Sequence, residues 1–321
     1  MERIRVGVVG AGGKARQHMG FMDEFEEVEF TALCDPLEEQ RNITGEEFQI
    51  GARFADMDEM LESTELDAAI VATPPELNAP AARACLERGI HTLLEKPPGM
   101  TVAETRELRD RAARTGARGM VGFNRRFHDQ ICAAREMVTE RGPVVQIVGE
   151  FHKSIDTLEG RYGSRPALMD NWLVANDIHA IDLVRCIADA EVEEVHSFAR
   201  RAFSEYRDVH GALVVFANQC VAHFIFNYTT DSRMERYEIH GRGISAYLEG
   251  VKQGVVFCDG KRHELPEPDD GLGGTRGEDH HFIRCLLEDR PIEAPAPNLD
   301  EAVKTMELAE AIRGGLREEN P

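Results

Sequence analysis

Residues 6–16 read Val6-Gly-Val-Val-Gly10-Ala-Gly12-Gly-Lys-Ala15-Arg, and this stretch decides the fold. An apolar run passes directly into a glycine-rich turn and then into residues that can form a helix, which is the order of elements in a phosphate-binding unit. Gly10 permits the tight turn, Gly12 lets the backbone approach a pyrophosphate, and Ala15 stands where a third glycine would allow close packing. The pattern also fits an ordinary glycine-rich turn, so its meaning depends on the sequence around it.

An acidic residue at the end of the second predicted strand favours the nucleotide interpretation. Asp35 follows Ala15 by 20 residues. A carboxylate there can accept hydrogen bonds from both hydroxyls of an adenosine ribose, and it repels a 2′-phosphate. The next residues, Pro36-Leu-Glu-Glu, supply no arginine to offset that repulsion. The sequence therefore predicts NAD in preference to NADP; a helix cap at Asp35 is the alternative.

The first 122 residues predict a doubly wound parallel sheet, the Rossmann class of α/β fold. Short apolar runs alternate with longer helical stretches, as in a sheet covered on both faces. Thr101 and Glu104 form a capping-box pattern and Gly116 ends the helix that follows, while Asn78 is expected to cap the helix that runs to Gly89. The predicted strands are residues 4–9, 29–34, 68–72, 92–94 and 119–122, with a short sixth at 53–54.

Residues 123–321 predict a second, α+β domain for substrate binding and oligomerisation. Helices are expected near residues 128–139, 178–187 and 298–316, and residues 263–277 are expected to form a loop. Alternating apolar and polar residues predict strands at 220–228, 236–240, 244–248 and 255–258, which suggests an open, mainly antiparallel sheet. Such a sheet, with large apolar residues on its second face, predicts a homodimer or homotetramer.

The charge and cysteine content argue against several classes of partner. Among 321 residues, 37 are Lys or Arg and 58 are Asp or Glu, so the formal net charge is −21. A chain with this charge repels the phosphates of nucleic acids and anionic lipid headgroups, so both are poor partners. No apolar run approaches the roughly 20 residues of a membrane span. The seven cysteines form no Cys-x-x-Cys pair, and we interpret His280 and His281 as structural, so no metal site is expected. A reduced, cytoplasmic protein is predicted.

The chain resembles the Gfo/Idh/MocA oxidoreductases over nearly its whole length. The motifs that carry the resemblance occur in the family's order: Gly10-Ala-Gly-Gly-Lys-Ala-Arg, Ala32-Leu-Cys-Asp35-Pro, Ala72-Thr73-Pro74-Pro75, Glu95-Lys96-Pro97, Asn124-Arg125-Arg126-Phe127, Ile178-His179-Ala-Ile-Asp182, Glu278-Asp-His-His-Phe282 and Met306-Glu-Leu-Ala-Glu-Ala-Ile312. The resemblance implies a nicotinamide cofactor at the junction of the two domains. It also implies hydride transfer at a carbon bearing oxygen in a sugar, inositol or related polyol.

Lys96 and His179 are the predicted catalytic residues. Oxidation of a secondary alcohol needs a positive group to steady the developing alkoxide and a base for the hydroxyl proton. Lys96 lies just beyond the fifth strand, where ligands of such sheets bind. His179 begins a helix, and Asp182 lies three residues further on the same face, from where it can orient the imidazole. An exposed loop lysine and a satisfied core histidine are the alternatives.

The chain departs from the family pattern around this histidine. Many members carry an acidic residue four positions before it and a glycine two positions before it, whereas this chain has Ala175 and Asp177. Either Asp177 takes over the carboxylate role or the site lacks one proton-relay group. Asn78 likewise stands where the family usually has a histidine.

The remaining site predictions concern cofactor and substrate contacts. One of Arg125 and Arg126 is expected to contact ligand, with Arg125 favoured, and Trp172 is expected either to stack on a sugar ring or to lie in the core. The predicted cofactor contacts are Gly10, Gly12, Gly13, Lys14, Ala15, Asp35, Thr73, Pro74, Asn78, Glu95, Lys96 and Arg125, and the predicted substrate contacts are Lys96, Arg125, Trp172, Asp177 and His179. Two other functions stay open: a glycosidase that retains its cofactor, and a non-catalytic dinucleotide sensor or co-regulator.

Overall fold

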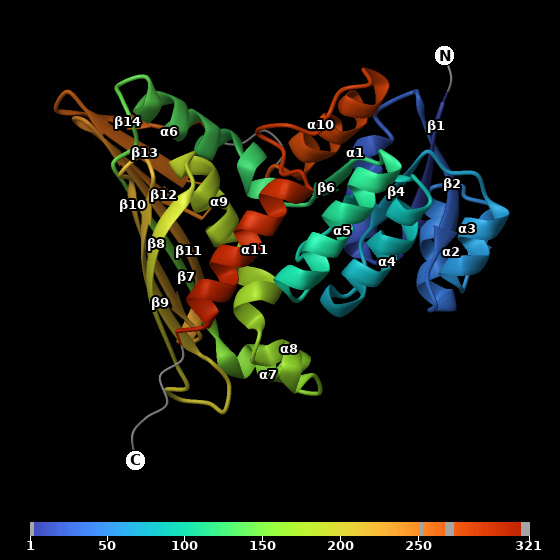
Figure 1. Cartoon of the computed structure of the whole chain (residues 1–321), viewed down its shortest axis with the longest axis horizontal. Coiled ribbons are helices and arrows are strands. Elements are labelled where there is room, and N and C mark those ends of the chain that lie inside the picture. The colour runs from blue at the N-terminus through green and yellow to red at the C-terminus, as the bar shows by residue number, and fades with distance from the viewer. Residues whose placement is uncertain (1–2, 251–252, 267–272, 316–321) are drawn as a thin grey trace. The chain divides into compact units, whose positions relative to one another are not determined.

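The computed structural model describes residues 3–250, 253–266 and 273–315. The chain forms two compact units (Figure 1). Unit 1 comprises Met1–Phe123 and Thr275–Val303, and unit 2 comprises Asn124–Gly274 and Lys304–Pro321. Residues 275–303 thus pack with the first unit although they follow the second in sequence. The functional division at residues 122 and 123 stays a prediction.

Unit 1 contains a six-stranded, entirely parallel sheet, which confirms the predicted fold class. The strand order is β3-β2-β1-β4-β5-β6, so the order reverses between β1 and β4. In an open parallel sheet, ligands bind outside the carboxyl ends of the strands at this reversal. The strands are β1 (Ile4–Val9), β2 (Val28–Cys34), β3 (Ala52–Phe54), β4 (Ala68–Val71), β5 (His91–Leu94) and β6 (Gly119–Val121).

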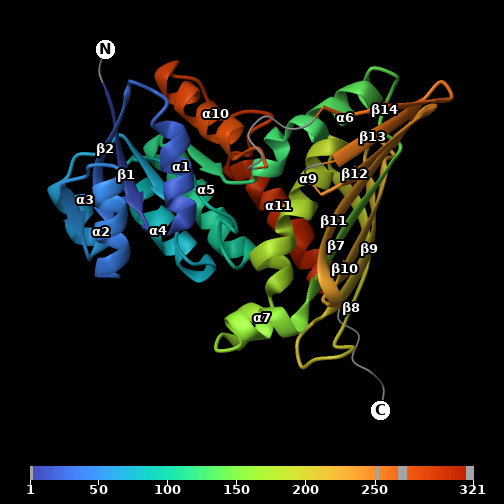
Figure 2. The same cartoon turned by 180° about the vertical axis from the view of Figure 1, so that it is seen from behind.

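The helices of unit 1 are α1 (Gly13–Met22), α2 (Glu38–Glu47), α3 (Met57–Ser63), α4 (Pro75–Glu87), α5 (Val102–Thr115) and α10 (Thr275–Leu287). Helices α4 and α5 pack together, and α10 returns from far along the chain to pack on α1 (Figure 2). The capping box predicted at Thr101 and Glu104 is present, and Gly116 ends α5 in the left-handed conformation.

The predicted helix cap at Asn78 is wrong. Helix α4 begins at Pro75, with Pro74 in the cap position. The fixed φ angle of proline suits the first helical position. Its missing N–H costs nothing there, because an N–H at that position has no partner within the helix. Asn78 therefore lies inside the helix, where its side chain is completely buried.

Unit 2 contains an eight-stranded sheet in the order β14-β13-β12-β11-β7-β10-β9-β8. Neighbouring strands are antiparallel except β7 and β10, which are parallel. The strands are β7 (Gln146–Ser154), β8 (Val192–Arg200), β9 (Val209–Phe216), β10 (Val221–Asn227), β11 (Thr229–Gly241), β12 (Ile244–Glu249), β13 (Gln253–Cys258) and β14 (Lys261–Glu264). The mainly antiparallel sheet is confirmed, whereas β7, β8 and β9 are not evident from the sequence pattern.

The loop predicted at residues 263–277 is only partly present. Strand β14 extends into its start, and α10 begins before its end at Thr275, while residues 267–272 lie outside the described residues. Strand β14 is exposed at all four positions, so its sequence lacks the alternation that marks a half-buried strand.

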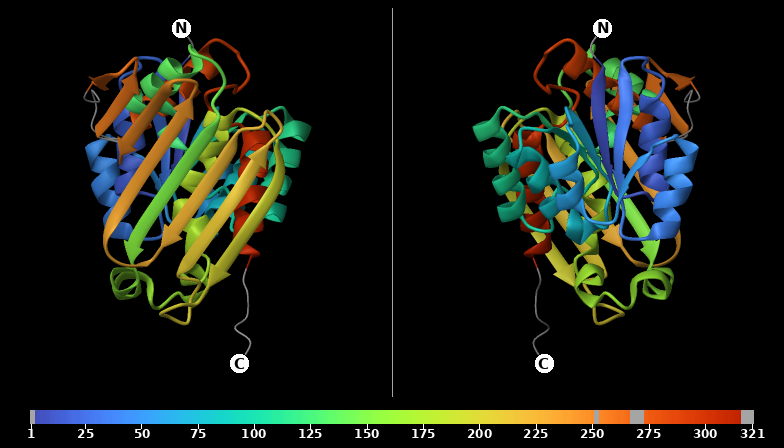
Figure 3. Two further views of the ribbon diagram at one scale, coloured as in Figure 1. Left: turned by 90° about the vertical axis from the view of Figure 1, so that its left-hand side faces the viewer. Right: turned by 90° about the vertical axis from the view of Figure 1, so that its right-hand side faces the viewer.

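Helices cover one face of the unit 2 sheet and leave the other open, as the left view of Figure 3 shows. The elements outside the sheet are a 3₁₀ turn, Asn124–Phe127, a π-helical turn, Leu173–Asp177, and the helices α6 (Asp129–Thr139), α7 (Ile155–Tyr162), α8 (Pro166–Met169), α9 (Ile178–Ala188) and α11 (Leu299–Arg313), of which α11 begins in unit 1. Among the described residues, every helix is too short or too polar to cross a membrane.

Candidate functional site

The glycine-rich turn of unit 1 has the geometry that a pyrophosphate needs. Gly10 adopts a φ of +95°, and a Cβ on it would lie 2.4 Å from the carbonyl oxygen of Ala72, so only glycine fits. Gly12 precedes the first turn of α1. A Cβ added at Gly12 or at Gly13 would meet no protein atom within 4 Å, so a ligand can approach the backbone N–H groups there.

Asp35 is anchored beside this turn. Its Oδ2 accepts a hydrogen bond of 2.7 Å from the N–H of Ala11, and its Oδ1 accepts one of 2.8 Å from the N–H of Leu37. These bonds hold the carboxylate at the carboxyl end of β2. Arg41 donates to the Asp35 carbonyl at 2.5 Å, so an arginine six residues downstream does reach this region, which the sequence analysis missed.

The segment that carries Lys96 lies outside the helices and strands, and hydrogen bonds with neighbouring residues hold it in place. Lys96 follows β5, and its N–H donates to Oε2 of Glu95 at 3.1 Å. Asn78 donates from Nδ2 to the carbonyls of Glu95 and Pro97, at 3.0 Å each, while its Oδ1 accepts from the hydroxyl of Thr73 at 2.8 Å. The hydrogen bonds of Asn78 therefore link the residues that follow β4 to the segment that carries Lys96.

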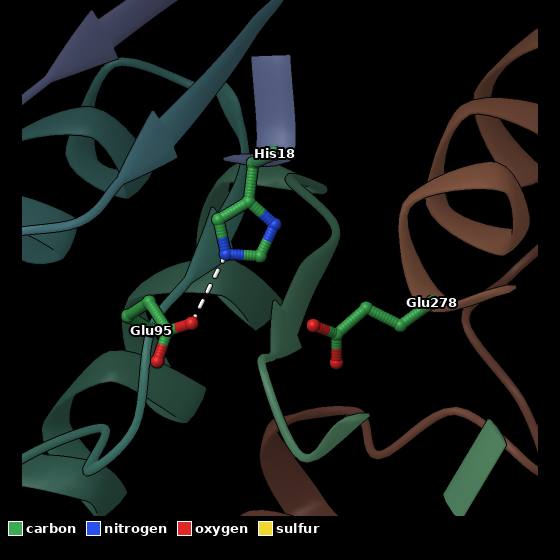
Figure 4. Close-up of side chains that lie close together, drawn as sticks. All are labelled: His18, Glu95 and Glu278. Carbon is green, nitrogen blue, oxygen red and sulfur yellow. Dashed lines mark hydrogen bonds and ion pairs between the residues drawn. The ribbon is translucent and has the colours of Figure 1, made fainter. Parts of the chain in front are cut away.

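A buried charged cluster lies behind this segment (Figure 4). The ring of His18 is placed between two carboxylates, with Nε2 at 3.0 Å from Oε1 of Glu95 and Nδ1 at 2.7 Å from Oδ1 of Asp279. The ammonium of Lys14 lies 3.2 Å from the same Glu95 oxygen. Glu278 is fully buried, and its carboxylate points towards His18 and Glu95. Among the described residues, neither of its oxygens has a hydrogen-bond partner.

The environment sets the protonation of this cluster. Burial alone would lower the pKa of His18, but Asp279 and Glu95 outweigh it and raise that pKa to about 10. Burial raises the pKa of Glu278 well above its ordinary value although the positive charges of His18 and Lys14 oppose this rise, and burial also raises the pKa of Asp279. The cationic groups of His18 and Lys14 thus face three buried acidic side chains, Glu95, Glu278 and Asp279.

The same side chains also have the donor types of a metal site. One ligand atom each from His18, Glu95 and Glu278 lies within 4.8 Å of the others. However, both ring nitrogens of His18 contact carboxylates, and Lys14 already supplies a positive charge to Glu95. We therefore interpret the cluster as an ionic anchor for the Lys96 segment, and the absence of a resident metal stays a prediction.

We expect the stabilising effect of His18 to disappear between pH 6.5 and about 10. A pKa raised from 6.5 to about 10 means that the folded state keeps a proton that the unfolded state releases. The contribution is therefore complete below pH 6.5 and is lost as the pH rises through 10. Urea unfolding of the wild type and His18→Gln should give stabilities that differ at pH 6 and converge at pH 10. A difference that stays constant with pH would contradict this protonation.

In unit 2, His179 is the second residue of α9 and is 9% exposed. The prediction that Asp182 orients its imidazole is wrong. Arg126 donates to both oxygens of Asp182 at 2.7 Å, and the hydroxyl of Thr305 donates to Oδ1 at 3.0 Å. A guanidinium can donate two parallel hydrogen bonds to one carboxylate. Asp182 therefore pairs with Arg126, although its helical spacing had predicted a contact with His179.

The two neighbouring arginines have different surroundings. Arg126 is buried with Asp182, whereas Arg125 donates to both oxygens of Glu235, at 3.1 and 3.2 Å. Burial opposes the charge on Glu235, but Arg125 outweighs it and holds the pKa of that carboxyl below its ordinary value. A role for Arg125 in ligand binding stays a prediction.

Asp177 does not stand free beside His179. It is completely buried, and its Oδ1 lies 3.0 Å from the ammonium of Lys153. Trp172 is 6% exposed and packs against Tyr162 with ring centroids 5.0 Å apart. The structure thus brings together Trp172 and Asp177 through Lys153, a residue that the sequence analysis did not single out.

These features define a protein with a Rossmann unit and an α+β second unit, and comparison with known families agrees. A family model described as "Oxidoreductase family, NAD-binding Rossmann fold" matches residues 4–123, and one described as "GFO/IDH/MocA C-terminal domain" matches residues 131–246. The chain belongs to the GFO/IDH/MocA family.

Curated relatives match part of the chain. The Rhizopine catabolism protein MocA of Rhizobium meliloti is 32% identical over 137 residues, which are 42% of this chain and 42% of that protein. Inositol 2-dehydrogenase of Rubrobacter xylanophilus is 30% identical over 201 residues, which are 61% of this chain and 55% of that protein. The chain thus spans about half the length of these relatives.

Solved structures share the fold over nearly the full length. UDP-N-acetylglucosamine 3-dehydrogenase GnnA from Acidithiobacillus ferrooxidans is 19% identical with a TM-score of 0.82, covering 98% of each chain. Aldose-aldose oxidoreductase from Caulobacter crescentus is 20% identical with a TM-score of 0.85, covering 98% of this chain and 97% of that one. At this identity the likeness establishes the fold.

Proposed function

We propose that the protein is an NAD-dependent oxidoreductase that transfers hydride between the cofactor and a secondary alcohol or ketone of a sugar, inositol or related polyol. The observation that carries the proposal is in unit 1, where the open glycine turn and the anchored Asp35 belong to the same sheet as the Lys96 segment. Relatives named as dehydrogenases of inositol and of sugars support the substrate class.

The residues have distinct roles in this proposal. Bound NAD supplies the hydride acceptor. Gly12 and Gly13 admit the pyrophosphate, and Asp35 accepts hydrogen bonds from the ribose hydroxyls. The ammonium of Lys96 stabilises negative charge on the reacting oxygen, while the imidazole of His179 takes up or returns the hydroxyl proton.

Asp35→Ala should weaken NAD binding by about 1–3 kcal/mol, the scale of a lost hydrogen bond to a charged group. The carboxylate repels a 2′-phosphate, so NADP binding should weaken less or improve, with Arg41 close enough to take part. Calorimetric titration of both cofactors into wild type and variant measures this. Equal affinity of the two proteins for NAD would show that Asp35 does not hold the ribose.

The activity itself is tested by following NADH absorbance with NAD and a panel of sugars, inositols, sugar acids and sugar nucleotides. NADH growth with one substrate class supports the dehydrogenase and narrows its substrate. Product formation without net NADH would favour a glycosidase that retains its cofactor. NAD binding with no turnover of any kind would favour the sensor or co-regulator.

We also propose a homodimer or homotetramer formed through the unit 2 sheet. The open sheet face carries large apolar side chains that are each 37–44% exposed, namely Phe198, Leu213, Ile225, Met234, Tyr247 and Phe257. Large apolar side chains exposed on an open sheet face are typical of an interface, and here the ion pair of Glu150 and Arg236 lies between Ile225 and the apolar residues of β12 and β13. Light scattering should give a multiple of 35.9 kDa, and Phe257→Asp with Ile225→Asp should shift it towards one chain.

The reducing cytoplasm is the proposed location. All seven cysteines are free thiols, including the exposed Cys132.

A further inference from the structure

Three buried acidic side chains in unit 1 face only two cationic ones. Glu95, Glu278 and Asp279 are 7%, 0% and 0% exposed, and His18 between them is 1% exposed. Lys14 completes the group, with its ammonium 3.2 Å from Oε1 of Glu95. If all five side chains were ionised, the cluster would carry one uncompensated negative charge. An unpaired charge in a protein interior is costly, and the group concerned normally binds a proton instead.

The same cluster has more acceptor oxygens than donors. Both oxygens of Glu278 and Oδ2 of Asp279 are buried and have no hydrogen-bond partner among the described residues. The Glu278 carboxylate points towards the other side chains (Figure 4), and one of its oxygens lies within 4.8 Å of a ring nitrogen of His18 and of an oxygen of Glu95. Buried polar atoms are normally paired, so the cluster lacks a donor. A proton bound to one of these carboxyls is such a donor, and it needs no cavity.

The proton belongs on Glu278 or Asp279 and not on Glu95. Burial raises the pKa of Glu278 and of Asp279, although the two cations of the cluster oppose the rise. Burial also opposes the charge on Glu95, but the same two cations, together with Lys96, outweigh it and hold the pKa of that carboxyl well below its ordinary value. Glu95 therefore stays ionised while the two neighbouring carboxyls of α10 titrate.

Lys14 connects this cluster to the glycine turn. It is the second residue of α1, whose N-terminus follows Gly12, and its side chain is 39% exposed. His18 lies four residues further on the same helical face, and at 1.5 Å per residue it is about 8 Å from Gly13 along the helix axis. Charges that far apart still interact where solvent is partly excluded. A charge bound at the glycine turn therefore acts on the cluster.

The N-terminus of α1 is where a dinucleotide would add two negative charges. Gly12 and Gly13 leave space for its pyrophosphate, and the first N–H groups of the helix are the donors it would meet. The ammonium of Lys14 would be drawn towards these charges, and the carboxylates of Glu278 and Asp279 would be repelled by them. Both effects favour a proton on those carboxyls. The proton comes from solvent and forms an O–H bond on one carboxylate oxygen, so no other bond is made or broken.

We propose that Glu278 and Asp279 form a buried proton-binding site whose occupancy rises when a dinucleotide binds at the glycine turn. Cofactor binding then takes up protons, so the affinity is highest at low pH and falls as the pH rises. The inference rests on the cofactor of the proposed function and holds for any substrate. The two carboxyls act on cofactor affinity through charge and take no part in hydride transfer.

Calorimetric titration of NAD measures the proton uptake. At one pH, the binding enthalpy is determined in two buffers with different ionisation enthalpies, such as Hepes and Tris, and the slope gives the protons taken up per NAD. We expect about 0.3–1 proton for the wild type between pH 6 and 9, with NAD affinity falling by up to about tenfold per pH unit. Glu278→Gln should lose most of the uptake, because its amide binds no proton and can donate to Asp279 instead.

Glu24→Gln is the matched control. Glu24 lies just beyond α1 and pairs with Arg276 of α10 at 2.7 Å, so it belongs to the same contact between the two helices, but its side chain is 36% exposed. This variant should keep the wild-type uptake. NAD binding without proton uptake at any pH from 6 to 9 would overturn the proposal. An uptake that Glu278→Gln leaves intact would also overturn it, since another group such as Asp35 would then be the source.

Infrared spectroscopy tests the site itself without turnover. A protonated carboxyl has a C=O stretching band that ionised carboxylates lack, and exposed carboxyls are ionised at pH 7.5. We expect this band in the cofactor-free wild type and in Glu24→Gln, its loss in Glu278→Gln, and its growth when NAD is added to the wild type. A wild type without the band at pH 7.5, with or without NAD, would overturn the proposal. Absence of NAD binding would instead count against the proposed function, and the band would still show whether the two carboxyls bind a proton.

Discussion

Lys96→Ala is expected to lose turnover by a factor on the order of 10²–10⁴ while it binds NAD as the wild type does. The ammonium is assigned to the charge that develops on the reacting oxygen, and removal of such a group raises the barrier of the chemical step. The proposed pyrophosphate and ribose contacts belong to the glycine turn and to Asp35, so NAD affinity should survive the loss of the Lys96 ammonium. NADH formation and calorimetric titration of NAD measure the two properties separately.

The matched control for Lys96 is Lys261→Ala. Lys261 belongs to the exposed strand β14, so its loss removes the same charge without touching the proposed site. Lys261→Ala should keep wild-type turnover. If Lys96→Ala instead loses NAD affinity and keeps its turnover at saturating NAD, Lys96 is a cofactor-binding residue and not a catalytic one.

Asp182→Ala is expected to lower the free energy of unfolding by about 3–5 kcal/mol, because it leaves the buried guanidinium of Arg126 without its carboxylate. The hydroxyl of Thr305 loses its acceptor as well. Urea unfolding at pH 7 measures the change.

Two controls separate the buried charge from other effects. The double variant Arg126→Met with Asp182→Leu removes both charges and should recover much of the lost stability, since apolar pairs can replace buried ion pairs. The pair of Arg141 and Asp259 has the same two-bond geometry on the surface, and Asp259→Ala should change stability little. Equal losses from Asp182→Ala and Asp259→Ala would show that burial does not set the cost.

Local patterns made the first 123 residues of unit 1 predictable from their sequence. The turn at Gly10, the strand that ends at Cys34 and the capping box at Thr101 each depend on residues close together in the chain. A turn that only glycine can adopt and a reciprocal pair of cap bonds leave few alternative structures.

Contacts between distant residues could not be predicted in the same way. Helical spacing placed Asp182 near His179, but it could not indicate that Arg126, 56 residues earlier, takes the carboxylate. His18 meets Asp279 across 261 residues of sequence. Strands such as β10 are recognised by alternating apolar and polar residues. In β7 two of the buried positions hold Gly149 and Lys153 instead of large apolar residues, so the strand was not predicted and Lys153 was missed.

The return of α10 to unit 1 has a consequence for the order in which the chain folds. A ribosome releases residues 1–123 long before Thr275–Val303, and at about 5–20 residues per second the interval is roughly 10 to 40 s. During that time His18 and Lys14 lack Asp279 and Glu278, so the nascent Rossmann sheet carries charged side chains that have not yet met their partners. Completion of unit 1 therefore waits until Thr275–Val303 has been synthesised, and chains that end before α10 should be retained by chaperones or degraded.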